Sequence, residues 1–162
     1  MNPCPCGYYG HTKKECRCTP HQIQKYVSRV SGPLLDRIDI HVEVPALESK
    51  DLKSDQTGET STALRDKVKA ARDTQYKRLN GHGHTTNAQM SGKLVKEYCV
   101  LDGEAETLLH QAMMELGISA RGYNKILKIS RTIADLEGSE KVRLEHISEA
   151  IQYRSLDRGL WR

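Results

Sequence analysis

The chain has 162 residues, a formal net charge of +4 and 5% aromatic residues with no phenylalanine. This length suits one domain or two small ones, and any core must be built from aliphatic side chains. No apolar run of about eighteen residues occurs, which excludes a membrane-spanning helix and leaves no membrane partner to expect. No apolar signal segment opens the sequence, so we expect a cytoplasmic protein. The modestly basic balance permits contact with nucleic acid without requiring it.

Four of the five cysteines form two tight pairs near the N-terminus. Cys4 and Cys6 are followed, after nine residues, by Cys16 and Cys18. Four thiolates on a short loop can bind one tetrahedral Zn²⁺, and a site closed by four protein ligands is structural rather than catalytic. The spacing therefore predicts a structural zinc knuckle.

Two other interpretations of this segment stay open. His11 could replace one thiolate as a metal ligand. The cysteines could instead form two disulfides in an oxidising compartment, which would leave Cys99 over.

Basic and aromatic residues surround the cysteine pairs. Lys13, Lys14 and Arg17 could contact a DNA backbone, with Tyr8 and Tyr9 available for stacking on bases. The same cations could instead offset the negative charge of four thiolates. Both interpretations fit the sequence.

The next segment contains one helix and the only strand that the pattern predicts. Residues 21–30 have helical periodicity, introduced by Thr19 as N-cap and Pro20 in the first turn. Residues 38–44 alternate apolar and polar side chains with β-branched enrichment, which predicts a strand. A lone strand cannot bury itself, so this one indicates a piece of a larger sheet.

The middle of the chain is polar and then helical. Residues 46–58 have no periodicity and are predicted to be a linker. An amphipathic helix is expected over 59–79 and a short helix over 91–99. The loop at 80–87 holds two histidines, which we interpret as solvated rather than metal-binding.

The last third of the chain predicts a helical bundle. Asp102 and Ser119 are placed to cap two amphipathic helices that close at Gly117 and Gly138. A third helix is expected over 144–154. Three helices with short connections form a compact bundle.

Short motifs lie in order along the whole chain. They are NPCPCG at 2–7, GPLLDRIDI at 32–40, SARGY at 119–123, ILKISRTIADL at 126–136 and AIQYRSL at 150–156. With this order and spacing, the chain resembles the C-terminal half of the magnesium chelatase-like AAA+ ATPases. Within that family it is most similar to the group named for a bacterial competence protein.

The resemblance implies roles for three polar residues. Asn2 matches sensor 1, which orients the water that attacks the γ-phosphate. Arg37 matches the arginine finger, supplied in trans to the nucleotide of a neighbouring subunit, where it stabilises developing charge. Arg121 matches sensor 2, at a helix N-terminus that also favours phosphate. Without the resemblance, Arg37 would be assigned an ion pair with Asp36 or Asp39, and Arg121 would be a solvated first-turn arginine.

The resemblance also implies the overall organisation. The fold class is mainly α with a small β element: a zinc knuckle and partial AAA+ core, then a helical lid. Residues 1–45 would be the C-terminal part of the ATPase core, 46–90 a linker and charged helix, and 91–162 the lid. Arg131 and Asp135, four residues apart on one helix, are expected to pair with each other.

The implied function belongs to a longer parent protein. That parent would be a homohexameric, DNA-translocating ATPase with helicase-like activity, using ATP and Mg²⁺. The 162 residues contain no G-x-x-x-x-G-K-S/T phosphate loop (Walker A) and no strand ending in paired acids (Walker B), so the chain alone should be inactive. Two alternatives remain, a stand-alone zinc-containing helical module that binds DNA or protein, and a motor component of a metal chelatase.

Overall fold

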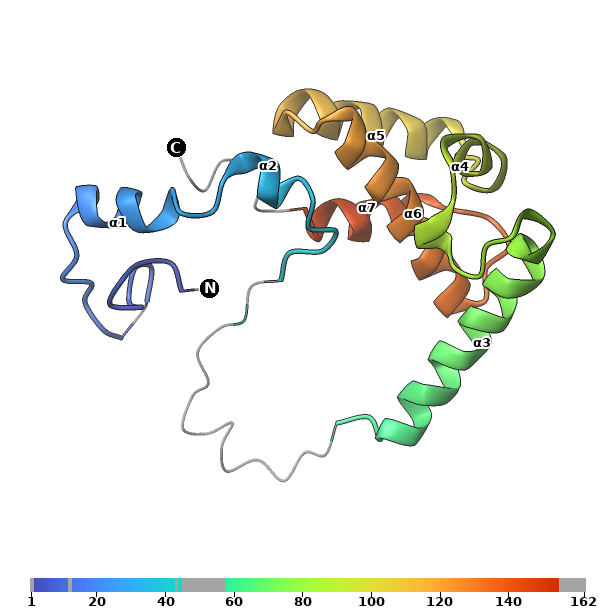
Figure 1. Cartoon of the computed structure of the whole chain (residues 1–162), viewed down its shortest axis with the longest axis horizontal. Helices are drawn as coiled ribbons and strands as arrows, with labels where there is room; N and C mark the ends of the chain where they lie inside the picture. Colours follow the sequence, from blue (N-terminus) through green and yellow to red (C-terminus); the bar gives the residue numbers. More distant parts are fainter. Residues whose placement is uncertain (1, 12, 43, 45–57, 155–162) are drawn as a thin grey trace.

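The structure is a computed structural model that describes residues 2–11, 13–42, 44 and 58–154 (Figure 1). These residues are mainly helical. Two single-turn 3₁₀ segments, Asn80–His82 and Asn87–Gln89, connect α3 to α4. The helices are α1 (Pro20–Val27), α2 (Gly32–Leu35), α3 (Ser61–Leu79), α4 (Gly92–Tyr98), α5 (Gly103–Leu116), α6 (Ala120–Glu137) and α7 (Leu144–Gln152).

Side-chain caps set the helix boundaries where the sequence predicted them. The Thr19 hydroxyl accepts a hydrogen bond from the backbone N–H of Gln22, and the backbone N–H of Thr19 donates in return to the Gln22 side chain. This capping box sets the start of α1 at Pro20. Asp102 caps α5, and Ser119 caps α6. These caps satisfy backbone N–H groups that would otherwise have no partner in the first turn.

The prediction of a strand over 38–44 is wrong for the described residues of this segment. Residues 38–42 and 44 form no strand, and the backbone N–H of His41 instead donates to the carbonyl of Tyr153, 2.7 Å away. The apolar side chains of the alternating pattern, such as Ile38, Ile40 and Val42, are exposed. The pattern needs a neighbouring strand to cover it, and no described residue supplies one.

One apolar core joins the end of α3 to α4, α5, α6 and α7. Its fully buried members include Leu79, Leu109, Ile126 and Ile147. Cys99 lies in the same core as a small hydrophobic residue. The N-terminal half of α3 extends away from this bundle (Figure 1).

A buried polar cluster fastens α3 to α6. The carboxylate of Asp135, fully buried, accepts hydrogen bonds from both terminal nitrogens of Arg78 at 3.0 and 2.6 Å. It also accepts from Arg131 Nε at 3.1 Å and from Asn87 Nδ2 at 2.8 Å. The predicted pairing of Arg131 with Asp135 is confirmed. Because every oxygen of the carboxylate is used, the cluster fixes the angle between the two helices.

Several sequence predictions lie outside the described residues. These are most of the 46–58 linker and residues 155–162 at the end of the predicted lid. Among the described residues, no helix combines the length and apolar character needed to cross a membrane.

Candidate metal centre and arginine sites

Two tight turns bring the four N-terminal cysteines together. Gly7 and Gly10 adopt φ angles of 81° and 78°, which residues with a Cβ rarely reach, and so reverse the chain between the cysteine pairs. The turn is closed by the Gly7 N–H, which donates to the Cys4 carbonyl at 3.1 Å. These two glycines therefore allow the turn that brings the cysteine pairs together.

The four sulfur atoms all lie within 4.8 Å of one another. Cys4 Sγ is 3.4 Å from Cys6 Sγ and 3.7 Å from Cys16 Sγ, and the four cysteines are free thiols. A disulfide needs a sulfur separation of about 2.05 Å. Four thiolates around Zn²⁺ lie about 3.8 Å apart, because each Zn–S bond is about 2.3 Å long. The cluster made by Cys4, Cys6, Cys16 and Cys18 could therefore hold a metal ion.

The local backbone favours thiolates in this cluster. The backbone N–H of Tyr8 is the main cause that lowers the pKa of Cys6 to about 6. At Cys16 the backbone N–H of Cys18 lowers the pKa, but burial and the neighbouring sulfurs outweigh it and raise the pKa to about 12. Sulfurs this close repel each other's negative charge, and a bound cation would remove that repulsion.

His11 has a different role from a metal ligand. Its Nδ1 accepts hydrogen bonds from the backbone N–H groups of Lys13 and Lys14, at 3.0 and 3.2 Å. The imidazole thereby stabilises the loop between the cysteine pairs. The ammonium of Lys14 also lies over the ring of Tyr8, 5.0 Å from its centroid.

Arg37 follows α2 and is exposed. Its Nη1 donates to the carbonyl of Pro33 at 3.3 Å, across the turn of α2. The ion pairs with Asp36 or Asp39 that the sequence left open do not form. Those carboxylates are held by the helical bundle instead: Asp36 accepts from Ser119, and Asp39 pairs with Lys125.

Arg121 lies in the first turn of α6 and is exposed. It lines a hollow of about 410 Å³ together with Ala120, Asn124, Lys125 and Lys128. Lys125 is paired with Asp39, so the positive charge of the hollow comes from Arg121, Lys128 and the N-terminus of an 18-residue helix, a combination that suits an anion.

Asn2 lies with the metal centre. Its side-chain amide is placed beside Gly7, in the first turn of the cysteine segment. No described hydrogen bond joins Asn2 to Arg37 or Arg121. The structure thus gathers the four cysteines and places the three proposed nucleotide residues on separate elements.

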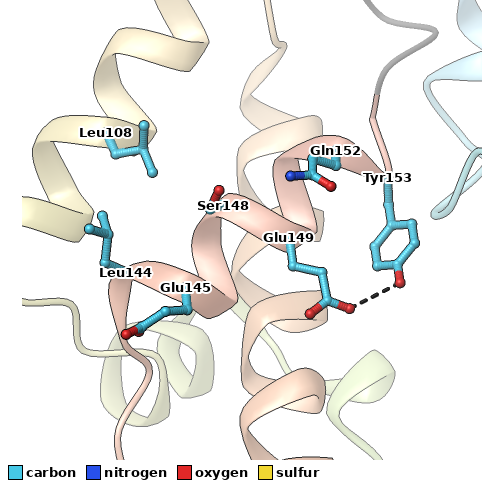
Figure 2. Close-up of a pocket in the computed structure, with 7 residues that line it drawn as sticks. All are labelled: Leu108, Leu144, Glu145, Ser148, Glu149, Gln152 and Tyr153. Atoms are coloured by element: carbon cyan, nitrogen blue, oxygen red, sulfur yellow. Dashed lines mark hydrogen bonds between the residues drawn. The ribbon is translucent and has the colours of Figure 1, made fainter.

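A second hollow, of about 680 Å³, lies between α5 and α7 (Figure 2). Leu108 and Leu144 form its apolar side, and Glu145 and Glu149 its acidic side. The hydroxyl of Tyr153 donates to Glu149 at 3.0 Å, which raises the pKa of this tyrosine. An acidic surface of this kind repels phosphate, so the hollow beside Arg121 is the better anion site.

Sequence reasoning missed the residues that connect the N-terminal segment to the bundle. Arg154 is completely buried, and its Nη1 donates to the carbonyl of Ile38, 116 residues earlier in the chain. No spacing rule links positions so far apart. The only signal in the sequence was their presence in two of the motifs that carry the family resemblance.

Comparisons with known proteins agree with those motifs. Residues 58–154 match the family described as magnesium chelatase, subunit ChlI C-terminal, and residues 1–52 match magnesium chelatase, subunit ChlI. The chain is 40% identical over 161 residues to competence protein ComM of Haemophilus influenzae, covering 99% of this chain and 30% of that protein. It is 38% identical over 161 residues to the uncharacterized protein YifB of Escherichia coli, covering 99% of this chain and 31% of that protein. The chain therefore spans about a third of the length of these relatives.

Proposed function

Because this chain belongs to the magnesium chelatase ChlI family, within its ComM/YifB group, we propose that it completes the ATPase site of a longer AAA+ protein. In this proposal Arg37 is the finger offered to the nucleotide of a neighbouring subunit. Arg121 contacts the nucleotide of its own subunit, and Asn2 orients the attacking water. ATP and Mg²⁺ would bind only in the longer protein, whose phosphate loop this sequence does not contain.

The observation that carries the proposal is the state of Arg37. It is exposed, and both flanking carboxylates are engaged by the bundle. An arginine neutralised by Asp36 or Asp39 would have little charge to offer a phosphoryl group. This arginine keeps its charge available on a segment held in place by other contacts, as transition-state stabilisation in trans requires.

The hollow beside Arg121 supports the second role. Its cations and the α6 N-terminus attract phosphate oxygens, and the guanidinium reaches solvent from the first helical turn. Since α6 belongs to the bundle core, movement of the bundle would carry Arg121 toward or away from a nucleotide. The bundle is therefore the lid in this proposal.

Zinc at the cysteine cluster completes the proposed architecture. Its four thiolates would hold a structural ion and brace residues 2–18. We further propose that the assembly is a homohexamer that translocates DNA, the activity expected of the competence group.

Replacement of each arginine in the full-length protein tests these roles. Arg37→Ala should lower kcat and leave nucleotide affinity largely unchanged. The loss of transition-state stabilisation should be about 3 kcal/mol or more. Arg121→Ala should change both nucleotide affinity and kcat. Arg65→Ala, on the exposed part of α3, is the matched control and should leave both unchanged.

Mixed assemblies separate a trans role from a cis role. Arg37→Ala subunits should be partly rescued by subunits that lack their own phosphate-loop lysine but keep Arg37. In such a mixture, some sites combine the phosphate-loop lysine of an Arg37→Ala subunit with Arg37 from its neighbour. Normal turnover of the Arg37→Ala protein, together with no rescue in any mixture, would remove the finger assignment.

A further inference from the structure

Arg154 is a charged residue with no exposed surface. It follows α7, and its Nη1 donates to the carbonyl of Ile38, while its Nη2 lies 3.8 Å from Asp36 Oδ1. Burying a guanidinium costs several kcal/mol unless partners compensate for the lost hydration. An apolar side chain would fill the same space at lower cost, so the contacts to residues 36 and 38 need an explanation.

Those two contacts lie on either side of Arg37. The guanidinium is a rigid planar fork, so it can reach the side chain before Arg37 and the backbone carbonyl after it together. Arg154 thereby holds the backbone after Arg37 by a hydrogen bond and lies within ion-pair distance of the side chain before it, while the Arg37 side chain stays exposed.

Three more contacts hold the same short segment against the bundle. Ser119 Oγ donates to Asp36 Oδ1 at 2.8 Å, and Lys125 Nζ lies 2.6 Å from Asp39 Oδ1. The N–H of His41 donates to the carbonyl of Tyr153, the residue before Arg154. In Figure 1 the segment after α2 runs along the C-terminal end of α7. The contacts come from two helices of the lid, the N-terminal turns of α6 and the C-terminal end of α7.

We propose that Arg154 is a positioning residue for Arg37, through which the lid sets the finger offered to the neighbouring subunit. This inference rests on the proposed function. It adds a structural link between a subunit's own nucleotide site and the site of the neighbouring subunit that Arg37 serves. Ser119, which caps α6 two residues before Arg121, also bonds Asp36. Lid motion in response to a subunit's own nucleotide therefore moves the finger that acts on the next nucleotide.

The test uses Arg154→Met in the full-length protein, because methionine retains much of the volume and removes the charge and the fork. A misplaced finger should lower kcat on the order of 10- to 100-fold with nucleotide affinity retained. The double variant Arg37→Ala/Arg154→Met should be no slower than Arg37→Ala alone, since Arg154 acts only through Arg37.

Arg131→Met is the matched control. Arg131 is also a buried arginine of the lid, but it pairs with Asp135 rather than with the segment around Arg37. In the double variant Arg37→Ala/Arg131→Met, the fold-losses in turnover of the two single variants should multiply, as expected if Arg131→Met causes a general loss of lid stability.

A structural measurement keeps the proposal testable if Arg154→Met folds poorly. Arg154→Lys keeps the charge but loses the fork, and it should speed hydrogen exchange at the amide of His41 while the α5 and α6 amides stay protected. Unchanged exchange at His41 in the folded variant would overturn the positioning role.

The kinetic outcomes distinguish the two proposals. Normal turnover of Arg37→Ala would overturn the finger and, with it, the positioning role. Impaired Arg37→Ala with normal Arg154→Met, or losses that multiply in the double variant, would overturn the positioning role alone.

Discussion

The cysteine segment and the helical bundle solve the same stability problem in different ways. Among residues 2–11 and 13–18, which the structure describes, Cys4 is the one buried apolar residue, whereas the bundle buries side chains from five helices in a continuous core. A segment of this size cannot bury enough apolar surface to offset its loss of conformational entropy. A bound metal can compensate in the first region, and the second has no need of one.

The difference also separates the roles that we propose. The bundle can act as a rigid lid because its core and its buried polar cluster define one arrangement of helices. The cysteine segment is a short loop around the four clustered cysteines, and it carries exposed cations. Metal removal should therefore unfold the cysteine segment, whereas substitutions in the buried core or polar cluster should destabilise the bundle.

Metal removal should produce the largest effect. Structural zinc contributes about 10–16 kcal/mol to the folding of small zinc domains, so chelation should abolish amide protection over residues 2–18. The bundle should keep its melting temperature because its core contains no ligand. Elemental analysis should find one zinc per chain, and hydrogen exchange should locate the change.

Two single substitutions sharpen the metal test. Cys4→Ser should lose the metal, whereas Cys99→Ala should retain it, since burial in the bundle raises the pKa of Cys99 to about 11. A chain without zinc whose four N-terminal thiols are freely reactive would contradict the assignment.

Disruption of the buried polar cluster should have the next largest effect, and only on the bundle. Asp135→Ala leaves Arg78 and Arg131 without their carboxylate, which should lower the free energy of unfolding by about 3–5 kcal/mol. Denaturant unfolding followed by circular dichroism measures this change. Metal content should be unaffected.

An exposed ion pair provides the control for that substitution. Glu59 and Lys67 pair at the start of α3 with about half of each side chain exposed. Glu59→Ala should cost no more than about 1 kcal/mol. Equal losses in the two variants would show that the buried cluster does not fasten α3 to α6.

The bundle was more predictable than the N-terminal segment because its signals are local. Asp102 and Ser119 predicted where α5 and α6 begin, and Gly117 and Gly138 predicted where they end. Both glycines adopt left-handed φ angles in the structure, 63° and 78°. Caps and amphipathic stripes act within a few residues, so spacing alone reveals them.

The strand prediction failed because a strand is defined by its neighbours. The alternation at Ile38, Ile40 and Val42 is real, but these side chains are exposed without a second strand among the described residues. The clustering of the four N-terminal cysteines, which could hold a metal ion, could be predicted from their spacing. The contacts of Arg154 could not, because they join positions more than a hundred residues apart and depend on tertiary packing.

Neutralising the cations around the cysteine segment should weaken DNA binding of the full-length protein. Lys13, Lys14 and Arg17 are exposed, and each phosphate contact contributes a salt dependence of about 0.9 in log affinity per log salt. Replacing all three by alanine should make the slope shallower by about two to three. Fluorescence anisotropy over a salt series measures it.

Helix α3 offers a charge-matched control. Arg65, Lys69 and Arg72 are exposed cations of α3, and replacing them by alanine removes the same formal charge. If both triple variants change the slope equally, the effect reflects net charge rather than the cysteine segment. Unchanged affinity in the Lys13, Lys14 and Arg17 variant would exclude a DNA role there, leaving these cations to offset the thiolates.

Acid should produce the smallest effect, through one exposed carboxylate of the bundle. Hydrogen bonds from His146 and from Arg143 lower the pKa of Glu137 in the folded state. A lowered folded-state pKa adds stability above the ordinary carboxyl range, and this stability is lost as the pH falls through the folded value. Glu137→Gln keeps an acceptor for both donors but cannot titrate, so its melting temperature should depend less on pH than that of the wild type between about pH 5 and 3. Identical pH profiles would contradict the coupling, whereas the expected divergence would assign part of the bundle's acid sensitivity to the junction between α6 and α7, a region that the metal does not stabilise.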